Sequence, residues 1–584
     1  MKSQDCGDGQ NNTKIRSEFD DLIERELAEY VYKLCRINDV IQIIGESVEY
    51  YYKNIGFIQG ERARLGAEIL LPLILKKYKK GSASASSDSI KVITEALQYA
   101  SDYRNYRDII FHSYNDNDSV SWQKIGNKFK IINHDLSVYR QLLAEMHSSI
   151  FSSKNMSKKI YSDNDKTIEE LLKGTKNFDY ENKNVVKASN YILKELQIKL
   201  DSFFSYIEPD SEISFGQYNY SDFFKVYHMM MFYALYERHN SRANNLPGVI
   251  TYTEEELIYA AEQNIQIEKS KCKKILLDIA SASRSTFVYL KTDSIYYLFP
   301  TAFSLLDGIS SILKQYAQLD SDAFSERFAG LIGDGLVNEI KSEFSCCRNF
   351  RTLTDLKLDK YDPSLPDIDV MAISYEPSLG FHFFIAEVKN NLPATWAKEY
   401  LKASGSKGFI SKALSQVDKV NKFLNSEDGQ RLLFETAIKE FSHLDMQKLF
   451  PTGFTVTVNQ LIITSQNMGM FFSDKHTTII EGEMLRHIIR ASDGDTNYIL
   501  FHLKNFDKIL DECLELLELQ TKIGKFEVTY NSFKMKQIFD LSENKYLSDG
   551  TFEELERSSI ETGYRFIDQL ISDNGNNQKY DLDI

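Results

Sequence analysis

Cysteine is scarce in this chain of 584 residues, and the spacing of the cysteines excludes two common architectures. The six cysteines form no CxxC pair and follow no regular spacing. Because a zinc ribbon and a disulfide-rich scaffold both need regularly spaced cysteines, the sequence is compatible with neither. This cysteine usage favours a reducing compartment.

Long apolar runs are also absent. Nowhere does the chain contain the run of about 18 apolar residues that a transmembrane helix needs. The polar N-terminus, MKSQDCGDGQNNTK, lacks the apolar core of a signal peptide. We therefore expect a cytoplasmic protein with no membrane partner.

An excess of positive charge is the third absence. Lys and Arg number 69 against 84 Asp and Glu, which leaves a net charge of −15 at pH 7. A chain with this charge cannot hold nucleic acid through its overall field, so any such binding needs a local basic patch. The 42% of apolar residues favours a folded protein, and the length predicts several domains.

The pattern of apolar residues predicts a multidomain organisation. Spacings of three and four residues favour helices in the N-terminal half, including residues 90–147, and a Gly/Ser-rich linker is expected at 81–89. Alternating strand and helix signals follow, and the acidic C-terminal sequence after them favours helix. The predicted order is a disordered segment at 1–14, a mostly α-helical region at 15–300, an α/β domain at 305–505 and an acidic helical tail at 506–584.

A candidate catalytic group lies in a predicted β-hairpin at residues 366–389. Asp369 begins the first strand, and the return strand ends in IAEVK. Because side chains alternate along a strand, Glu387 and Lys389 share a face, and Asp369 can lie beside them. Two close carboxylates repel unless a hard cation lies between them, and Mg²⁺ prefers carboxylate oxygens. A water held by that cation can attack a phosphodiester, and the lysine can orient it.

Asp369, Glu387 and Lys389 resemble the core motif of the PD-(D/E)XK nuclease superfamily, which has the restriction-endonuclease-like fold. The leading Pro366 and Asp367 fit the same motif. The resemblance implies a central mixed β-sheet flanked by helices, and a site in which Asp369 and Glu387 bind Mg²⁺ or Mn²⁺. Asp367 competes with Asp369 for the first carboxylate. Family members of the (E/D)-I-D-hydrophobic type use the aspartate that directly enters the strand, which favours Asp369.

The flanking segments extend the resemblance. In the superfamily a helix before the hairpin often adds an acidic residue to the metal site, and Glu326 and Glu339 are both candidates here. A helix after the lysine strand often contains a glutamine near the site, and Gln416 matches it. A further strand and helix match residues 459–464 and 477–489.

Lysines cluster around the predicted glutamine helix. Trp396 and Tyr400 are interleaved with them, a pattern that suits contact with a phosphate backbone. For any one of these lysines the alternative is an ordinary solvated helix face. The candidate nucleic-acid-binding residues are Lys398, Lys402, Lys407, Lys412 and Lys419.

A second motif lies in the helical half. Arg107 and His112 form an Arg-x4-His pattern that resembles the motif of HEPN ribonucleases, which cleave RNA without a metal. Such a pair also arises by chance in a chain of this length, as a helix with a surface arginine and a partly buried histidine.

The sequence therefore predicts a metal-dependent endonuclease whose products, by resemblance, carry 5′-phosphate and 3′-hydroxyl ends. DNA is the expected substrate because most superfamily members cut DNA. The helical half is expected to sense, recruit, bind a regulatory partner or oligomerise, a layout that resembles restriction and anti-phage defence effectors. The alternatives are a catalytically silent scaffold and a HEPN-type ribonuclease.

Overall fold

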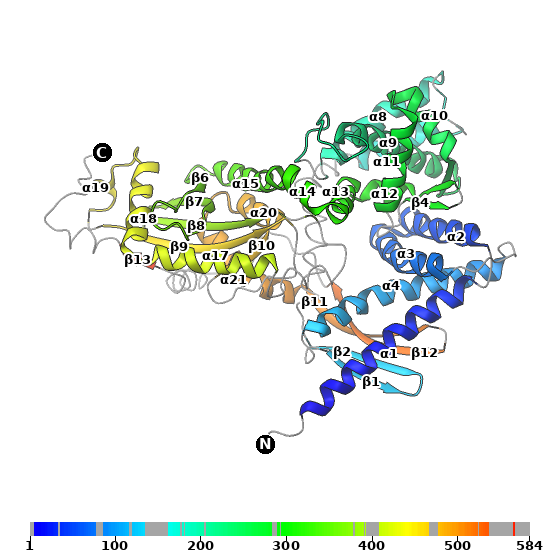
Figure 1. Ribbon diagram of the computed structural model, residues 1–584, viewed down its shortest axis with the longest axis horizontal. Coiled ribbons are helices and arrows are strands. Elements are labelled where there is room, and N and C mark those ends of the chain that lie inside the picture. The colour runs from blue at the N-terminus through cyan, green and yellow to red at the C-terminus, as the bar shows by residue number, and fades with distance from the viewer. Residues whose placement is uncertain are drawn as a thin grey trace.

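The computed structural model is a mixed α/β protein whose described part contains three β-sheets (Figure 1). A lobe built on one large mixed sheet lies at one end, and helices with two smaller sheets lie at the other. Apart from a few single residues and pairs, the described residues are 5–32, 36–77, 86–115, 120–134, 162–282, 289–377, 380–390, 408–465, 477–535 and 564–566.

Helices begin almost at the start of the chain, as α1 Asp5–Tyr32, α2 Ile37–Tyr50, the π-helical turn η1 Tyr51–Ile55, α3 Phe57–Lys77 and α4 Ser87–Asn115. The prediction of disorder for residues 1–14 is wrong from Asp5 onward. Once a helix has nucleated, each added residue gains a hydrogen bond at a small cost in conformational entropy. Helix α1 therefore extends into the polar residues at its N-terminal end. Most of the linker expected at 81–89 lies outside the described residues.

A β-hairpin lies within residues 90–147, for which the sequence predicts helices. Strands β1 Val120–Ile125 and β2 Lys128–Asn133 pair in antiparallel fashion across Gly126, whose φ is +61°. Trp122 and Phe129 are buried, and burial alternates along β2 and along the first half of β1. This period of two, with a Gly-Asn turn, is the hairpin signal that the helical prediction missed.

The predicted helical tail is wrong over residues 514–535. Helix α21 Thr496–Glu512 does run past residue 506, but strands β11 Leu514–Ile523 and β12 Phe526–Met535 follow it. Strand β12 pairs in parallel with β2, which gives a sheet of order β1-β2-β12-β11. Alternate residues of β12 are buried against the N-terminal helices and hairpin, so a partner about 400 residues away decides the conformation of this segment.

A second group of helices follows the N-terminal part, namely α7 Ser162–Leu172, α8 Lys183–Asp201, α9 Tyr220–Asn244, α10 Glu254–Ile265, α11 Lys269–Ala282, α12 Pro300–Leu305, α13 Gly308–Leu319 and α14 Ser321–Arg327. A small antiparallel sheet of order β3-β5-β4 joins them, with β3 Ile250–Thr253, β4 Tyr289–Thr292 and β5 Ile295–Leu298. Helix α13 packs against α11, so this helical group continues past residue 305.

The mixed sheet contains β6 Phe350–Leu356, β7 Ile368–Glu376, β8 Gly380–Lys389, β9 Thr455–Thr464 and β10 Thr477–Glu481, in the order β10-β9-β8-β7-β6. The first three strands form an antiparallel meander, whereas β9 runs parallel to β8 and β10 runs parallel to β9. Strand β13 Tyr564–Phe566 adds to part of β9.

Helices cover both faces of this sheet. On one face lie α17 Phe409–Leu424 and α18 Glu427–Glu440, followed by the short α19 Met446–Leu449. On the other face lie α15 Ala329–Ser345, α20 Gly482–Ser492 and α21. Because neighbouring side chains on a strand point to opposite faces, β8 sends Ile385 toward α17 and α18 and sends Phe384 toward α15. No helix among the described residues is long and apolar enough to cross a membrane.

Candidate active site

The two predicted metal ligands lie opposite each other on neighbouring strands. The antiparallel register pairs Val370 with Ala386, so the residues one step further along, Asp369 of β7 and Glu387 of β8, face each other. Directly opposed residues in such a pair have Cβ atoms about 4.5–5.5 Å apart. The hairpin therefore brings the two carboxylates together on the face that α17 covers.

The other two predicted residues contact Glu387. Lys389 Nζ donates a hydrogen bond to Glu387 Oε1. The side chain of Gln416, half-buried on α17, also hydrogen-bonds the Glu387 carboxylate. Asp369 is held differently, because its Oδ2 accepts from the backbone N–H of Val388 at 2.7 Å. All four predicted catalytic residues thus meet at one place.

The electrostatics of this group disfavour two bare carboxylates. Burial raises the pKa of Glu387, and the charge of Asp369 raises it further, while Lys389 and Gln416 act in the opposite direction. Burial also raises the pKa of Asp369, against the N–H of Val388 and the charge of Lys389. Raised carboxyl pKa values mean that negative charge here is poorly compensated by the protein itself.

Two further aspartates border this pair. Asp355 of β6 lies between Thr354 and Leu356, which pair with Val370 and Ile368 of β7, so Asp355 borders Asp369, and its charge raises the pKa of Asp369. It has a left-handed backbone with φ of +54°, which aspartate tolerates better than most residues. Asp367, the competing first carboxylate, forms an ion pair with Lys357 and lines a small pocket together with Glu387. Sequence reasoning missed Asp355 because only the strand register places it here.

The chemistry of these donors suits a divalent cation, although no three of the four carboxylates bring their oxygens within 4.8 Å of one another. The group has four carboxylates, those of Asp355, Asp367, Asp369 and Glu387. Among the described residues only two cations, Lys357 and Lys389, form ion pairs with them. The group therefore has a formal excess of two negative charges. Oxygen ligands of this kind suit Mg²⁺ or Mn²⁺. Asp369 and Glu387 are the residues that would hold the ion.

Neither predicted accessory acid belongs to this group. Glu339 of α15 accepts from Arg486 Nη1 at 3.0 Å and from the Tyr206 hydroxyl at 3.2 Å. It therefore takes part in a structural ion-pair network on the opposite face of the sheet. Glu326 is exposed on α14, within the helical group. Helix α15 packs on the sheet, but Glu339 is engaged by Arg486 and Tyr206.

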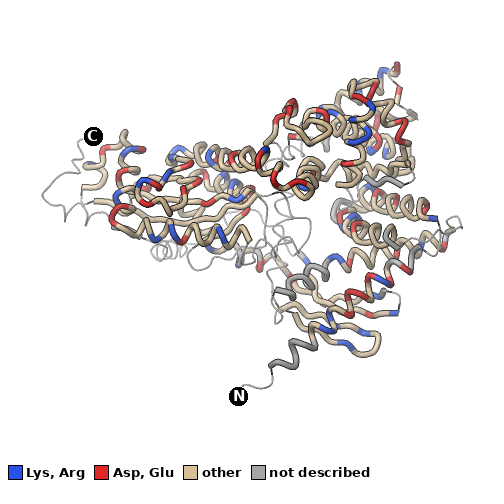
Figure 2. Tube along the Cα trace, viewed as in Figure 1, with Lys and Arg blue, Asp and Glu red and all other residues tan. Residues whose placement is uncertain are grey.

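Only two of the five predicted nucleic-acid-binding lysines lie within the described residues. Lys412 and Lys419 are exposed on α17, the helix that carries Gln416. Figure 2 shows basic positions recurring along this helix. Lys398, Lys402 and Lys407 fall outside the described residues, as do Trp396 and Tyr400.

The HEPN-like motif lies on one helix. Arg107 and His112 both belong to α4, as the helical prediction requires for this segment. Their side chains fall outside the described residues. The motif therefore stays a prediction from sequence.

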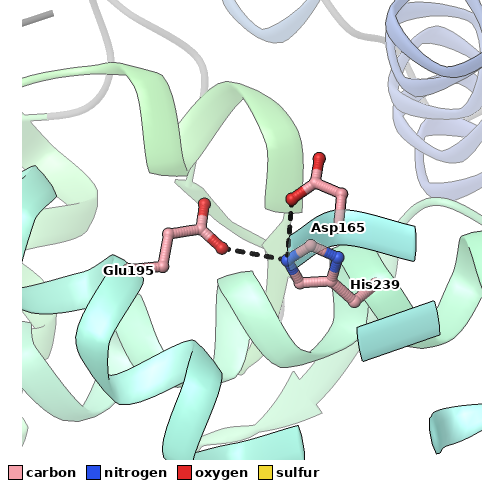
Figure 3. A group of neighbouring side chains, drawn as sticks. All are labelled: Asp165, Glu195 and His239. Atoms are coloured by element: carbon pink, nitrogen blue, oxygen red, sulfur yellow. Dashed lines mark hydrogen bonds and ion pairs between the residues drawn. The ribbon is translucent and has the colours of Figure 1, made fainter. Parts of the chain in front are cut away.

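A second charged cluster lies in the helical group, where Asp165 of α7, Glu195 of α8 and His239 of α9 converge (Figure 3). Their ligand atoms lie within 4.8 Å of one another, a spacing that could hold a metal ion. However, Arg238 Nη2 lies 2.7 Å from Glu195 Oε1 and 3.0 Å from His239 Nε2. A guanidinium beside two of the three ligands already supplies the positive charge that a metal would bring.

The pKa of Glu195 supports this interpretation. Burial raises it, but Arg238 and His239 outweigh burial and hold the pKa far below its usual range. Arg242 lies 3.8 Å from Asp165, so a second arginine balances the second carboxylate. We interpret the cluster as a buried ion-pair network that joins α7, α8 and α9. Sequence reasoning did not find it, because its members are spread over 75 residues.

Comparison with known proteins identifies no relative, since no family model, no curated protein and no solved structure matches this chain. The assignment of a function therefore rests on the geometry and chemistry of the residues described above.

Proposed function

We propose that this protein is a metal-dependent nuclease that hydrolyses phosphodiester bonds of nucleic acid. The observation that carries the proposal is the opposition of Asp369 and Glu387 on adjacent strands, with Lys389 and Gln416 on the Glu387 carboxylate. The Glu387 side chain is buried and that of Asp369 is half-buried, and burying carboxylates is unfavourable unless a cation completes the group.

Each residue has a distinct part in this proposal. Asp369 and Glu387 hold Mg²⁺ or Mn²⁺, which when bound would act as a Lewis acid beside the scissile phosphate. The Lys389 ammonium orients the attacking water or offsets negative charge that develops on the phosphate. Gln416 fixes the carboxylate of Glu387 from the helix above the strand.

The order of structural elements supports the proposal. A helix, α15, precedes the meander β6-β7-β8, and the Gln416 helix α17 follows it, as the resemblance to PD-(D/E)XK nucleases leads one to expect. Strands β9 and β10 and helix α20 come next and complete a sheet with helices on both faces. A restriction-endonuclease-like fold is therefore part of the proposal.

The substrate class follows from chemistry near the site and from the resemblance. Lys412 and Lys419 project from α17 on the same side of the sheet as Glu387, where cations can follow a phosphate backbone. We propose DNA as the substrate, and a role in restriction or anti-phage defence, by analogy with other nucleases of this layout.

The direct test incubates the full chain with plasmid DNA, single-stranded DNA and RNA. Each substrate is tested with Mg²⁺, with Mn²⁺ and with EDTA. Lys389→Ala is compared with Lys448→Ala, which removes an exposed lysine of α19 in the same lobe. The proposal expects metal-dependent cutting that Lys389→Ala abolishes and Lys448→Ala leaves unchanged.

Other outcomes point to other functions. Cutting of RNA that persists in EDTA and disappears in His112→Ala would move the activity to the HEPN-like motif. Cutting of none of the substrates in any metal would contradict the nuclease proposal for the isolated chain. It would favour a silent scaffold in which the sheet serves assembly.

A further inference from the structure

Gln460 is a polar residue in a buried strand beside the candidate active site. In β9 the parallel register pairs Gln460 with Ile385 of β8 and pairs Ile462 with Glu387. Residues two apart on a strand share a face, so Gln460 projects from the same face as Glu387. Only 6% of its surface is exposed.

The Gln460 amide has an unsatisfied donor. Its Nε2 is buried, and no described residue accepts a hydrogen bond from it. A buried donor without a partner destabilises the folded state, and native proteins retain few of them. Such a group requires an explanation, and a ligand that supplies the missing acceptor is one.

The surroundings of Gln460 limit the size of that ligand. Gln460 lines a small pocket whose other polar groups are Asp367 and Glu387, with Ile385, Val417 and Val420 as its apolar wall. The two valines belong to α17 and cover the sheet at this point. A nucleic-acid backbone is too large to reach a side chain covered in this way. A water molecule is small enough, and the polar lining offers the roughly three partners that a buried water has on average.

We propose that Gln460 is a positioning residue of the candidate active site, whose amide N–H donates to a water that in turn donates to the Glu387 carboxylate. The inference rests on the proposed function, because it assigns Gln460 to the support of a cation-binding carboxylate. Lys389 and Gln416 hold Glu387 from the strand and from the helix, and Gln460 holds it from the neighbouring strand. Groups that orient metal ligands in this way change activity or metal affinity by about 10–100-fold when they are removed.

The chain contains a matched control one residue away. Asn459 is only 5% exposed, and its Oδ1 also has no described hydrogen-bond partner. It pairs with Phe384 in the register and therefore lies on the opposite face of the sheet, away from the pocket. Gln460 and Asn459 thus share strand, burial and an unsatisfied polar atom, and differ in their relation to Glu387.

The test compares Gln460→Met with Asn459→Leu in the full chain, since each change removes the polar atoms with little change of shape. Mn²⁺ affinity is measured by isothermal titration calorimetry, and Tm is measured by scanning calorimetry. The kcat and KM values are measured on the substrate that the wild type cleaves. Both variants are expected to keep or raise Tm, because each loses an unsatisfied buried group. Gln460→Met alone is expected to weaken Mn²⁺ binding or lower kcat by about 10–100-fold, with KM within about twofold.

Three results would overturn the inference. Gln460→Met with the Mn²⁺ affinity and kcat of the wild type would show that Glu387 needs no support from β9. A joint loss of Tm and kcat would show that Gln460 serves only the fold. A rise in KM at constant kcat would show that Gln460 contacts the substrate itself. A wild type that cleaves nucleic acid beside an unaffected Gln460→Met variant overturns this inference alone, whereas a wild type that cleaves no nucleic acid in either metal overturns the proposed nuclease function.

Discussion

Two buried charged groups in this protein have similar members and opposite electrostatics. In the helical group, Glu195 is paired with Arg238 and His239, and its pKa is lowered in spite of burial. In the mixed sheet, Glu387 is paired with one lysine beside a second carboxylate, and its pKa is raised. The comparison teaches that a cluster of acids indicates a cation site only where the protein leaves its charge uncompensated. By that criterion the sheet carries the candidate active site, and the triad of Figure 3 does not.

The strongest test of this difference removes one carboxylate charge from the sheet. Glu387→Gln keeps the shape of the side chain but removes one of the two predicted metal ligands. Loss of metal-assisted catalysis is expected to reduce cleavage at least a thousandfold, which corresponds to about 4 kcal/mol. Because the charge of Glu387 is itself poorly compensated, the free energy of unfolding is expected to stay the same or to rise. Cleavage assays and denaturant unfolding of the same preparations measure the two effects. A catalytically normal Glu387→Gln variant would remove the basis of the assignment.

The same substitution in the helical cluster is expected to do the reverse. Glu195→Gln removes the carboxylate that lies 2.7 Å from the buried Arg238 and leaves only that of Asp165, at 3.9 Å. Breaking a buried ion pair is unfavourable by about 3 kcal/mol, so the free energy of unfolding is expected to fall by that order. Denaturant unfolding measures the loss. Cleavage by the fraction that stays folded is expected to be unchanged. A stable Glu195→Gln variant with lower metal content than the wild type, by elemental analysis, would instead favour a metal at the triad.

Part of this architecture could be predicted from local sequence. The hairpin of Asp369 and Glu387 was predictable because strand alternation and the turn lie within about 20 residues of each other. Gln416 and the helix that carries it were predictable by resemblance to the family. Asp355 and Gln460 were not, because their places depend on strand register and not on any local pattern.

Partners distant in the sequence explain the larger errors. Strand β12 pairs with β2, which lies about 400 residues earlier in the sequence. Because the local sequence around β11 does not contain that pairing, its acidic composition predicted a helix. The hairpin β1–β2 showed the period of two but lies between helical segments, where the surrounding pattern prevailed. Local periodicity thus predicted the strands that carry Asp369 and Glu387, and failed where β12 pairs with the distant β2.

Divalent cations offer a third way to separate the two clusters. A ligand that binds only the folded state stabilises it by about 2.7 kcal/mol at a hundredfold excess over its Kd. Mn²⁺ is therefore expected to raise the Tm of the wild type and of an Arg242→Lys variant, and EDTA to reverse the rise. Glu387→Gln is expected to lose the response. A response that survives in Glu387→Gln but disappears in His239→Ala would place the cation in the helical group.

A third buried carboxylate gives an intermediate case with the smallest expected effect. Glu49 of α2 is 6% exposed and accepts from the backbone N–H groups of Thr301 at 3.0 Å and Ala302 at 3.3 Å. It is compensated by dipoles and not by a close cation. Burial raises its pKa to about 7, against the effect of these hydrogen bonds and of the charge of Arg242.

The sign of the resulting pH dependence follows from linkage. The folded pKa of Glu49 is raised, so the folded state binds a proton more tightly than the unfolded chain does. Its contribution to stability is complete below the unfolded pKa of 4.5 and is lost as the pH rises through about 7. Between pH 5 and pH 8 this carboxyl group is expected to reduce the free energy of unfolding by about 2 kcal/mol. Glu49→Gln removes the titrating group and should flatten that slope. The free energy of unfolding from denaturant curves is plotted against pH for the wild type and for Glu49→Gln. Equal slopes would mean that backbone N–H groups compensate a buried carboxylate as fully as the arginines do in the helical cluster. Uncompensated charge would then be confined to the sheet.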